Sequence, residues 1–221
     1  MIHVISGNKG GVGKSLTCTA LIDIALQQNL KVILVDSDPH NPDVYKSHAE
    51  EISSHALDLG RNEGWIDLIN VLDQNRDAAI IINCPAGANV SMVKFGALLT
   101  DAIVETKHQL HVLWVINRNR DGLESLKELK EAHPSWSISV IRNNYFGTPE
   151  KFELFNSSKL KLEIEASGGK VIDLPDLAAR VGDMLSGQRM SISKANVNMN
   201  LGNRMELQRW RNATRQALAV I

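Results

Sequence analysis

The sequence is poor in cysteine and has no long apolar run. Its two cysteines, Cys18 and Cys84, are too few for a disulfide framework, and no cysteine or histidine spacing is typical of a zinc site. No apolar run approaches the roughly 20 residues of a membrane-spanning helix. The apolar run at Ile2–Ser6 stops at Gly7, which is too short for a secretory leader. We therefore expect a cytoplasmic protein with reduced thiols.

The sequence also lacks a strong charge of either sign. A net charge of −1 excludes electrostatic binding of nucleic acid by the whole molecule, although a local basic patch is compatible with it. Hydrophobic residues make up 43% and charged residues 22%, as in soluble globular proteins. No repeat, low-complexity tract or linker divides the 221 residues. We predict a single domain over residues 1–221.

Short apolar strands alternate with helical segments along the chain. We predict strands at 2–6, 31–35, 56–59, 78–82, 111–116, 138–141 and 170–173. We predict helices at 16–28, 42–54, 64–74, 90–100, 122–132, 152–165, 177–185 and 204–219, with a polar connection over 187–203. This alternation predicts one doubly wound α/β domain, a mostly parallel sheet with helices on both faces.

A glycine-rich loop joins the first strand to the first helix. It fits the phosphate-loop pattern G-x-x-x-x-G-K-[ST], except that Asn8 stands where the first glycine belongs. Asparagine tolerates a left-handed backbone, so this change is mild. Glycines let N–H groups point at an anion, and the helix N-terminus adds positive potential. We predict a nucleoside triphosphate site with Mg²⁺, formed by Gly10, Gly11, Val12, Gly13, Lys14, Ser15 and Leu16.

The segment K-G-G-V-G-K-S resembles the deviant phosphate loop of the ParA/MinD-type ATPases, which has a second lysine at its start, here Lys9. The resemblance implies that Lys9 reaches across a dimer interface to the partner's nucleotide. ATP would then drive a sandwich homodimer, with Lys9, Lys14 and Asp38 acting in hydrolysis. On the motif alone, the alternative is that Lys9 is a solvated loop lysine.

Two acids, Asp36 and Asp38, follow the second strand in the order D-S-D-P. Strand alternation predicts that both point to one side, at the sheet edge where open α/β folds bind ligands. They could hold Mg²⁺, orient water, or merely cap the next helix. The family's D-x-D-P segment implies that Asp38 orients water and Asp36 supports the metal, so the metal candidates are Ser15, Asp36 and Asp38.

The segment Ile80–Gly87 resembles the family's Walker B strand and switch loop, but Asn83 replaces the usual acid. An amide accepts a hydrogen bond from metal-bound water but brings no charge. We expect weaker Mg²⁺ binding or slower hydrolysis. This leaves open a nucleotide-gated regulatory protein with little ATP turnover, or an ordinary strand-end turn.

The base pocket gives a weaker signal. Asn143 follows a strand and resembles the family's adenine-binding asparagine, with Asn144 as the rival, and Pro175 resembles a residue that lines the base. No N-K-x-D guanine signature is present, which favours ATP.

The C-terminal helix carries four arginines against the single acid Glu206: Arg204, Arg209, Arg211 and Arg215. They could contact DNA phosphates, acidic lipid (less favoured) or a partner protein. They could also be a solvated face of a helix that Trp210 and Leu218 dock on the sheet. The resemblance favours a plasmid partition, maintenance or conjugal-transfer role, with DNA or a plasmid-encoded protein as the partner.

Overall fold

The structure, a computed structural model, describes all 221 residues. Its seven strands form one sheet in the order β3-β2-β4-β1-β5-β6-β7, and all neighbouring strands are parallel. The predicted doubly wound α/β fold is confirmed. The strands are β1 (Ile2–Ser6), β2 (Val32–Asp36), β3 (Ser53–Ala56), β4 (Ala79–Asn83), β5 (Leu110–Ile116), β6 (Ser137–Asn143) and β7 (Val171–Leu174).

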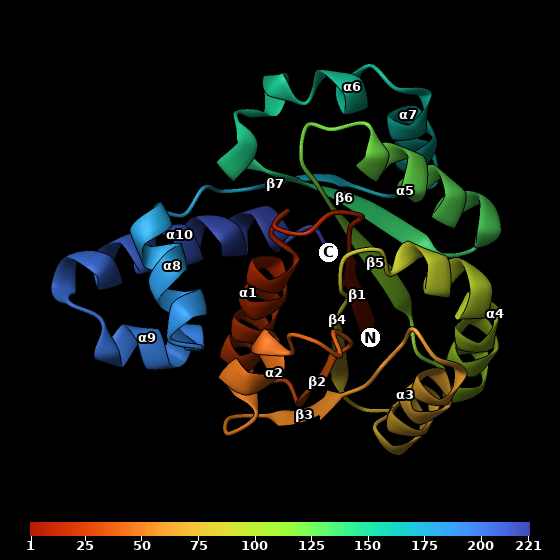
Figure 1. Cartoon of the computed structure of the whole chain (residues 1–221), viewed down its shortest axis with the longest axis horizontal. Coiled ribbons are helices and arrows are strands. Elements are labelled where there is room, and N and C mark those ends of the chain that lie inside the picture. Colours follow the sequence, from red (N-terminus) through yellow and green to blue (C-terminus); the bar gives the residue numbers. More distant parts are fainter.

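Helices cover both faces of the sheet (Figure 1). Val4 and Ile5 on β1 pack into opposite cores because successive strand side chains alternate. One face carries α3 (Asn62–Gln74), α4 (Asn89–Thr106), α5 (Asp121–Ala132), α6 (Glu153–Asn156) and α7 (Lys159–Ala166). The other carries α1 (Lys14–Gln27), α2 (Asp43–His48), α8 (Ala179–Gly187), α9 (Ile192–Asn198) and α10 (Leu201–Leu218). Two 3₁₀ turns, η1 (Asn144–Phe146) and η2 (Pro149–Lys151), follow β6.

The predictions between the second and fourth strands were partly wrong. The helix predicted over 42–54 is only the short α2, and the strand predicted at 56–59 lies earlier, at β3. β3 is an edge strand with Ser53, Ser54 and His55 in it, so it lacks an apolar signal. The apolar Leu59 is buried in the loop that follows β3, where it packs into the core without forming a strand.

Two predictions in the C-terminal half also need correction. The helix predicted over 152–165 is broken into α6 and α7, because Ser158 caps a new helix by accepting a hydrogen bond from the Lys161 N–H. The polar connection predicted over 187–203 contains α9 and the start of α10. Ser191 caps α9 in the same way, and Ile192 packs into the core beside α1.

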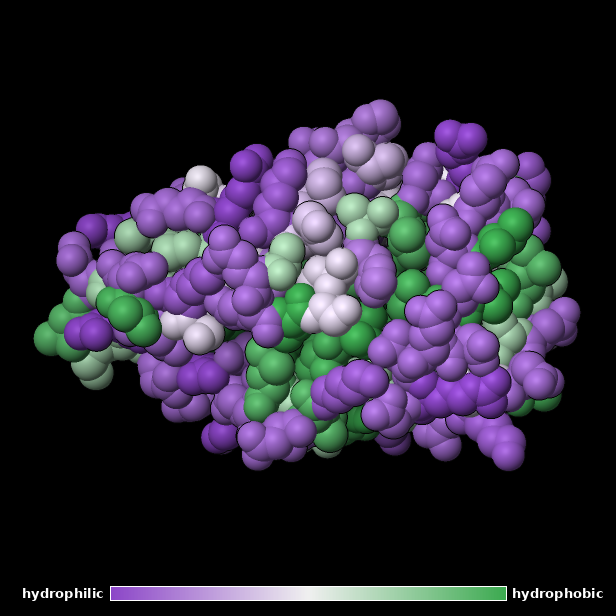
Figure 2. Space-filling view, turned by 90° about the horizontal axis from the view of Figure 1, so that it is seen from below, coloured by the Kyte–Doolittle hydropathy of each residue, from purple (hydrophilic) through white to green (hydrophobic).

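The last three helices lie at the left-hand end of the molecule in Figure 1. Figure 2 shows a mostly hydrophilic face with hydrophobic surface near its centre and at this same end. α9 and α10 carry three exposed apolar side chains, those of Val197, Leu201 and Met205. The C-terminal helices therefore bury one side against α1 and expose apolar groups on another. No helix in the chain combines the length and apolar character needed to cross a membrane.

Candidate functional site

The predicted phosphate loop lies at the centre of the sheet edge. β1 is the central strand. β4, β2 and β3 lie on one side of it and β5, β6 and β7 on the other, so the order in which strands are added reverses here. Ligands of doubly wound folds bind at such switch points. Gly11 and Gly13 have φ angles of 73° and 107°, the left-handed region, whereas Asn8 does not use it. No side chain caps the N-terminus of α1, so its N–H groups are free for an anion.

The loop is tightly packed against β6. A Cβ atom on Gly13 would lie 2.4 Å from Asn143 Nδ2, so only glycine fits there. Asn143 Nδ2 donates to the Val12 carbonyl oxygen at 2.8 Å, and Asn143 Oδ1 accepts from the Tyr145 N–H at 3.1 Å. The Asn143 amide thus supports the phosphate loop, a role that sequence reasoning missed.

Lys14 points back into the loop. Its Nζ donates to the Lys9 carbonyl oxygen at 2.7 Å, and the residue is 7% exposed. Burial lowers the pKa of Lys14, while nearby Cys84 and Asp38 oppose that shift. An arriving phosphate would offer this buried ammonium an opposite charge in place of a neutral carbonyl. The geometry therefore suits Lys14 to a phosphate ligand.

A cavity of about 570 Å³ opens beside the loop. Most of the residues predicted to bind phosphate and metal line this cavity. Residues of α2 and α8, which belong to no recognisable sequence motif, line it as well. Its lining comprises Gly10, Gly11, Gly13, Lys14, Ser15, Leu16, Thr19, Asp38, Asp43, Val44, Ser47, Asn83, Cys84, Pro85, Ala86, Gly182, Asp183, Leu185, Ser186 and Met190. Asp36, Asn143 and Pro175 do not line it. Residues such as Asp183 come from a remote segment, which local patterns could not identify.

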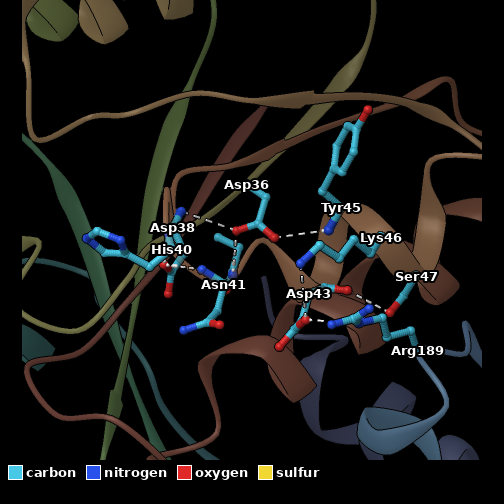
Figure 3. Close-up of polar contacts among 10 residues, drawn as sticks. Asp36, Asp38, His40, Asn41, Asp43, Tyr45, Lys46, Ser47 and Arg189 are labelled. Atoms are coloured by element: carbon cyan, nitrogen blue, oxygen red, sulfur yellow. Dashed lines mark hydrogen bonds and ion pairs between the residues drawn. The ribbon is translucent and has the colours of Figure 1, made fainter.

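Asp36, the last residue of β2, and Asp38, two residues beyond it, have different surroundings (Figure 3). Asp36 is 1% exposed and accepts hydrogen bonds from the Tyr45 N–H at 3.0 Å and Asn83 Nδ2 at 3.0 Å. Burial raises the pKa of Asp36, and these hydrogen bonds oppose that shift. Asp38 lines the cavity, and its Oδ1 accepts from the N–H groups of His40 and Asn41. Of the two acids, only Asp38 reaches the cavity, and β2 ends at Asp36.

Asn83 stands beside Asp36 in the sheet register, at the end of β4. Its Nδ2 is used by Asp36, but its Oδ1 is buried and has no hydrogen-bond partner in the protein. Asn83 also lines the cavity. An orphaned buried acceptor at this position fits a water on a metal ion.

Both thiols are free and buried, as the sequence favoured. Burial raises the pKa of Cys84 to about 11, although the nearby hydroxyl groups of Ser37 and Ser6 and the charge of Lys14 oppose the shift. Cys84 is therefore a neutral thiol at physiological pH and a poor nucleophile.

The residues predicted to read the base lie at the ends of β6 and β7. Asn143 pairs in register with Leu174, so Pro175 follows directly beside it. The Asn143 amide makes one hydrogen bond within the protein through its NH₂ group and one through its oxygen. Asn144 Oδ1, by contrast, is buried without a partner. Asn144 therefore has an unused acceptor, and Asn143 keeps one unused amide hydrogen.

Lys9 lies at the surface of the loop. Its Nζ forms an ion pair with Asp121 Oδ2 at 2.7 Å, and the two side chains are about half exposed. Asn8 Nδ2 also donates to the Asp121 carbonyl oxygen at 3.3 Å. Asp121 is the first residue of α5, and an acid at a helix start is so common that its sequence context gave no functional signal.

The C-terminal arginines do not form one free cationic face. Arg211 is paired with Asp23 of α1, and Arg209 with Glu206. Trp210 and Leu218 are buried in the core, as the docked-helix interpretation predicts. The cationic surface is therefore smaller than the count of arginines suggests.

The chain is similar to known proteins over nearly its whole length. The sequence model of the CobQ/CobB/MinD/ParA nucleotide binding domain matches residues 3–193. Protein MobD of Acidithiobacillus ferrooxidans is 43% identical over 217 residues, which are 98% of this chain and 96% of that protein.

Solved structures with the same fold include an ATP complex of a Cyanothece McdA variant, with a TM-score of 0.58 and 15% identity over 100% of this chain and 96% of that one. The cell division protein MinD of Aquifex aeolicus has a TM-score of 0.53 and 15% identity over 96% and 95%. A nucleotide-binding protein of Archaeoglobus fulgidus, in complex with ADP, has a TM-score of 0.53 and 13% identity over 86% and 87%.

Proposed function

The chain belongs to the CobQ/CobB/MinD/ParA nucleotide-binding family, and we propose that it is an ATPase that binds ATP with Mg²⁺ and dimerises on binding. The observation that carries this proposal is the phosphate loop, with Lys14 turned into it and Lys9 exposed at its start. Lys14 and the N–H groups of the loop would hold the phosphates. ATP is favoured over GTP because the chain has no guanine signature.

The residues around the loop fit a magnesium ion held largely by the nucleotide. The protein has no cluster of three or more His, Cys, Asp or Glu side chains that could hold a metal alone. Ser15 is exposed at the cavity, Asp38 lines it, and Asn83 Oδ1 lacks a partner. Ser15 would be a direct ligand, with Asn83 and Asp38 accepting from coordinated or attacking water. Mg²⁺ would neutralise phosphate charge.

Dimerisation would use Lys9. The half-exposed side chain is held only by a surface ion pair, which is a weak interaction, so Lys9 can leave Asp121 for a phosphate of a facing nucleotide. Asp36 would act indirectly, because its hydrogen bond fixes Asn83 at the cavity wall.

The test is size-exclusion chromatography with light scattering, in a non-hydrolysable ATP analogue and in ADP. We expect a dimer only with the analogue, and a monomer for Lys9→Ala in both. Lys31→Ala is the matched control, because Lys31 is also a half-exposed lysine in a surface ion pair, with Asp77. A monomeric wild type in both nucleotides contradicts the sandwich dimer.

A second candidate is a nucleotide-gated binding protein with little turnover. The observation in its favour is Asn83, which leaves the end of β4 uncharged. Phosphate release separates the two: turnover that is lost in Asp38→Ala supports the ATPase, and tight ATP binding without turnover, with or without DNA, supports the gated protein.

We place this activity in plasmid mobilisation or maintenance, on the strength of the 43% identity to MobD. The cargo would be DNA, reached by Arg204 and Arg215, or a plasmid-encoded protein. A mobilisable plasmid that carries the Lys14→Ala allele should transfer less often than wild type. DNA binding should weaken steeply with salt if phosphate contacts carry it.

A further inference from the structure

The loop that follows β7, residues 175–178, is held by side chains of α10. β7 is the edge strand and pairs only with β6, so this loop has no second strand beside it. Trp210 Nε1 donates to the Pro175 carbonyl oxygen at 2.8 Å. Glu206 Oε1 accepts from the Ala178 N–H at 3.2 Å. Both ends of the loop are thus fixed by one helix, which lies beside β7 and α1 in Figure 1.

A third contact comes from the same helix face. Arg209 Nη2 donates to the Asp176 carbonyl oxygen at 3.0 Å. The guanidinium also binds both carboxylate oxygens of Glu206, each at 2.7 Å. Residues 206, 209 and 210 stand at i, i+3 and i+4, so they share one face of α10. Their side chains satisfy backbone groups of the loop that no strand reaches.

The next residue of α10 connects the helix to the phosphate site. Arg211 binds Asp23 of α1 through two contacts, of 2.6 Å and 2.7 Å. The side chains are only 22% and 9% exposed, so this bidentate pair is well protected from solvent. α1 starts at Lys14 in the phosphate loop. α10 therefore ties the loop after β7 to the helix that carries the phosphate-binding residues.

We propose that Trp210, with the Glu206–Arg209 pair, is a positioning residue that holds loop 175–178 as a preformed wall for the base of the nucleotide. This rests on the proposed function and on the family resemblance, which implies that Pro175 lines the base; Pro175 follows Leu174, which pairs in register with Asn143, and Asn143 contacts the phosphate loop. α10 lies beyond residues 3–193, the part that matches the family domain, so the brace comes from a segment outside that matched region. A loop that is ordered before binding raises affinity, because less freedom is lost on binding.

The wall should matter for the nucleoside and not for the phosphates. We therefore compare the Kd values for ATP and for inorganic tripolyphosphate, by calorimetry with Mg²⁺, in Trp210→Phe. This change removes the donor to Pro175 but keeps an apolar ring. We expect ATP binding to weaken by about fivefold, the worth of one hydrogen bond, with tripolyphosphate binding unchanged.

Trp136→Phe is the matched control. Trp136 is also buried, its Nε1 donates to Thr100 Oγ1 at 2.9 Å, and it belongs to the core on the opposite face of the sheet. This variant should lose thermal stability without any change in the Kd for ATP. Glu206→Ala is a milder second variant in case Trp210→Phe does not fold, with an expected loss of about threefold in ATP affinity alone.

The inference is overturned if the α10 variants bind ATP as tightly as wild type, or lose ATP and tripolyphosphate affinity equally. It is also overturned if Trp136→Phe weakens ATP binding as much as Trp210→Phe. The inference is also contradicted if the wild-type protein binds tripolyphosphate and ATP equally tightly, because the base then contributes nothing to binding. A wild-type protein that binds neither contradicts the proposed function itself, and the two failures are therefore distinguishable.

Discussion

Replacing Asn83 by aspartate would restore the acid that the Walker B strand usually carries, and we expect it to destabilise the nucleotide-free protein. Asn83 Nδ2 donates to Asp36 Oδ1 at 3.0 Å, and the two residues are 3% and 1% exposed. The substitution removes this donor and places a second carboxylate against the first. Because both positions are buried, little solvent screens an added negative charge. The same burial already raises the pKa of Asp36.

The size of the effect follows from the distance. Two charges about 3 Å apart repel by about 5 kcal/mol at an effective dielectric constant near 20, so the pair keeps one proton instead. The unfolded chain, with carboxyl pKa values near 4, does not hold that proton at neutral pH. The folded pKa is raised, so stability is lost as pH rises, by up to about 1.4 kcal/mol per pH unit. Between pH 6 and 8 the penalty should therefore grow by about 3 kcal/mol.

Urea unfolding at pH 6, 7 and 8, in EDTA and without nucleotide, measures this penalty relative to wild type. Asn83→Leu is the control, because it loses the same donor without adding charge, and its penalty should change with pH much less than that of Asn83→Asp. The double variant Asp36→Asn/Asn83→Asp should recover most of the stability, since the exchanged amide can donate to the exchanged carboxylate and still accept from the Tyr45 N–H. A penalty in Asn83→Asp that does not vary with pH refutes the reasoning.

Three further outcomes are expected. Burial lowers the pKa of His3 to about 4, so the unfolded state takes up its proton first and stability is lost as pH falls from about 6.5 to 4. His3→Phe should reduce this loss in urea unfolding without the same change at pH 8, and part of the loss should remain because burial also lowers the pKa values of His48 and His111. Gly13→Ala should abolish ATP binding in calorimetry, because its Cβ would overlap the Asn143 amide at a φ of 107°. Asp121→Ala should leave the melting temperature unchanged and increase the dimer fraction with an ATP analogue, since it releases Lys9; an unchanged dimer fraction would show that the ion pair does not restrain Lys9.

Much of the fold and of the phosphate site was predictable because the signals are local. The strand, glycine-rich loop and helix over residues 2–28 each carry their own pattern, and consecutive residues complete the phosphate loop. The failures occurred where the local pattern is weak. β3 is a polar edge strand, and α9 has seven residues and packs through few apolar side chains.

Residues that reach the site from distant segments were not predictable. Asp121 contacts Lys9, and Asp183 lines the cavity, because the parallel sheet brings strand ends and following loops to one edge. Asn143 was identified by its place after a strand, but its occupied amide depends on a contact with Val12 across 131 residues of chain. Asn143 Nδ2 bonds to Val12 while Asn144 Oδ1 has no partner, and this difference in orientation cannot be read from sequence spacing.

The change at position 83 makes physical sense once its neighbour is considered. Asp36 and Asn83 occupy paired positions on β2 and β4, so a carboxylate at both would be a buried like-charge pair whenever no metal is bound. An amide at one position turns that repulsion into a hydrogen bond and leaves Asn83 Oδ1, in a residue that lines the cavity, as an unpaired acceptor. A nucleotide-free state stabilised in this way gains less from metal binding. Slow turnover would then be a consequence of a stable empty site, and Asn83→Asp should lower stability without nucleotide while strengthening Mg²⁺ dependence.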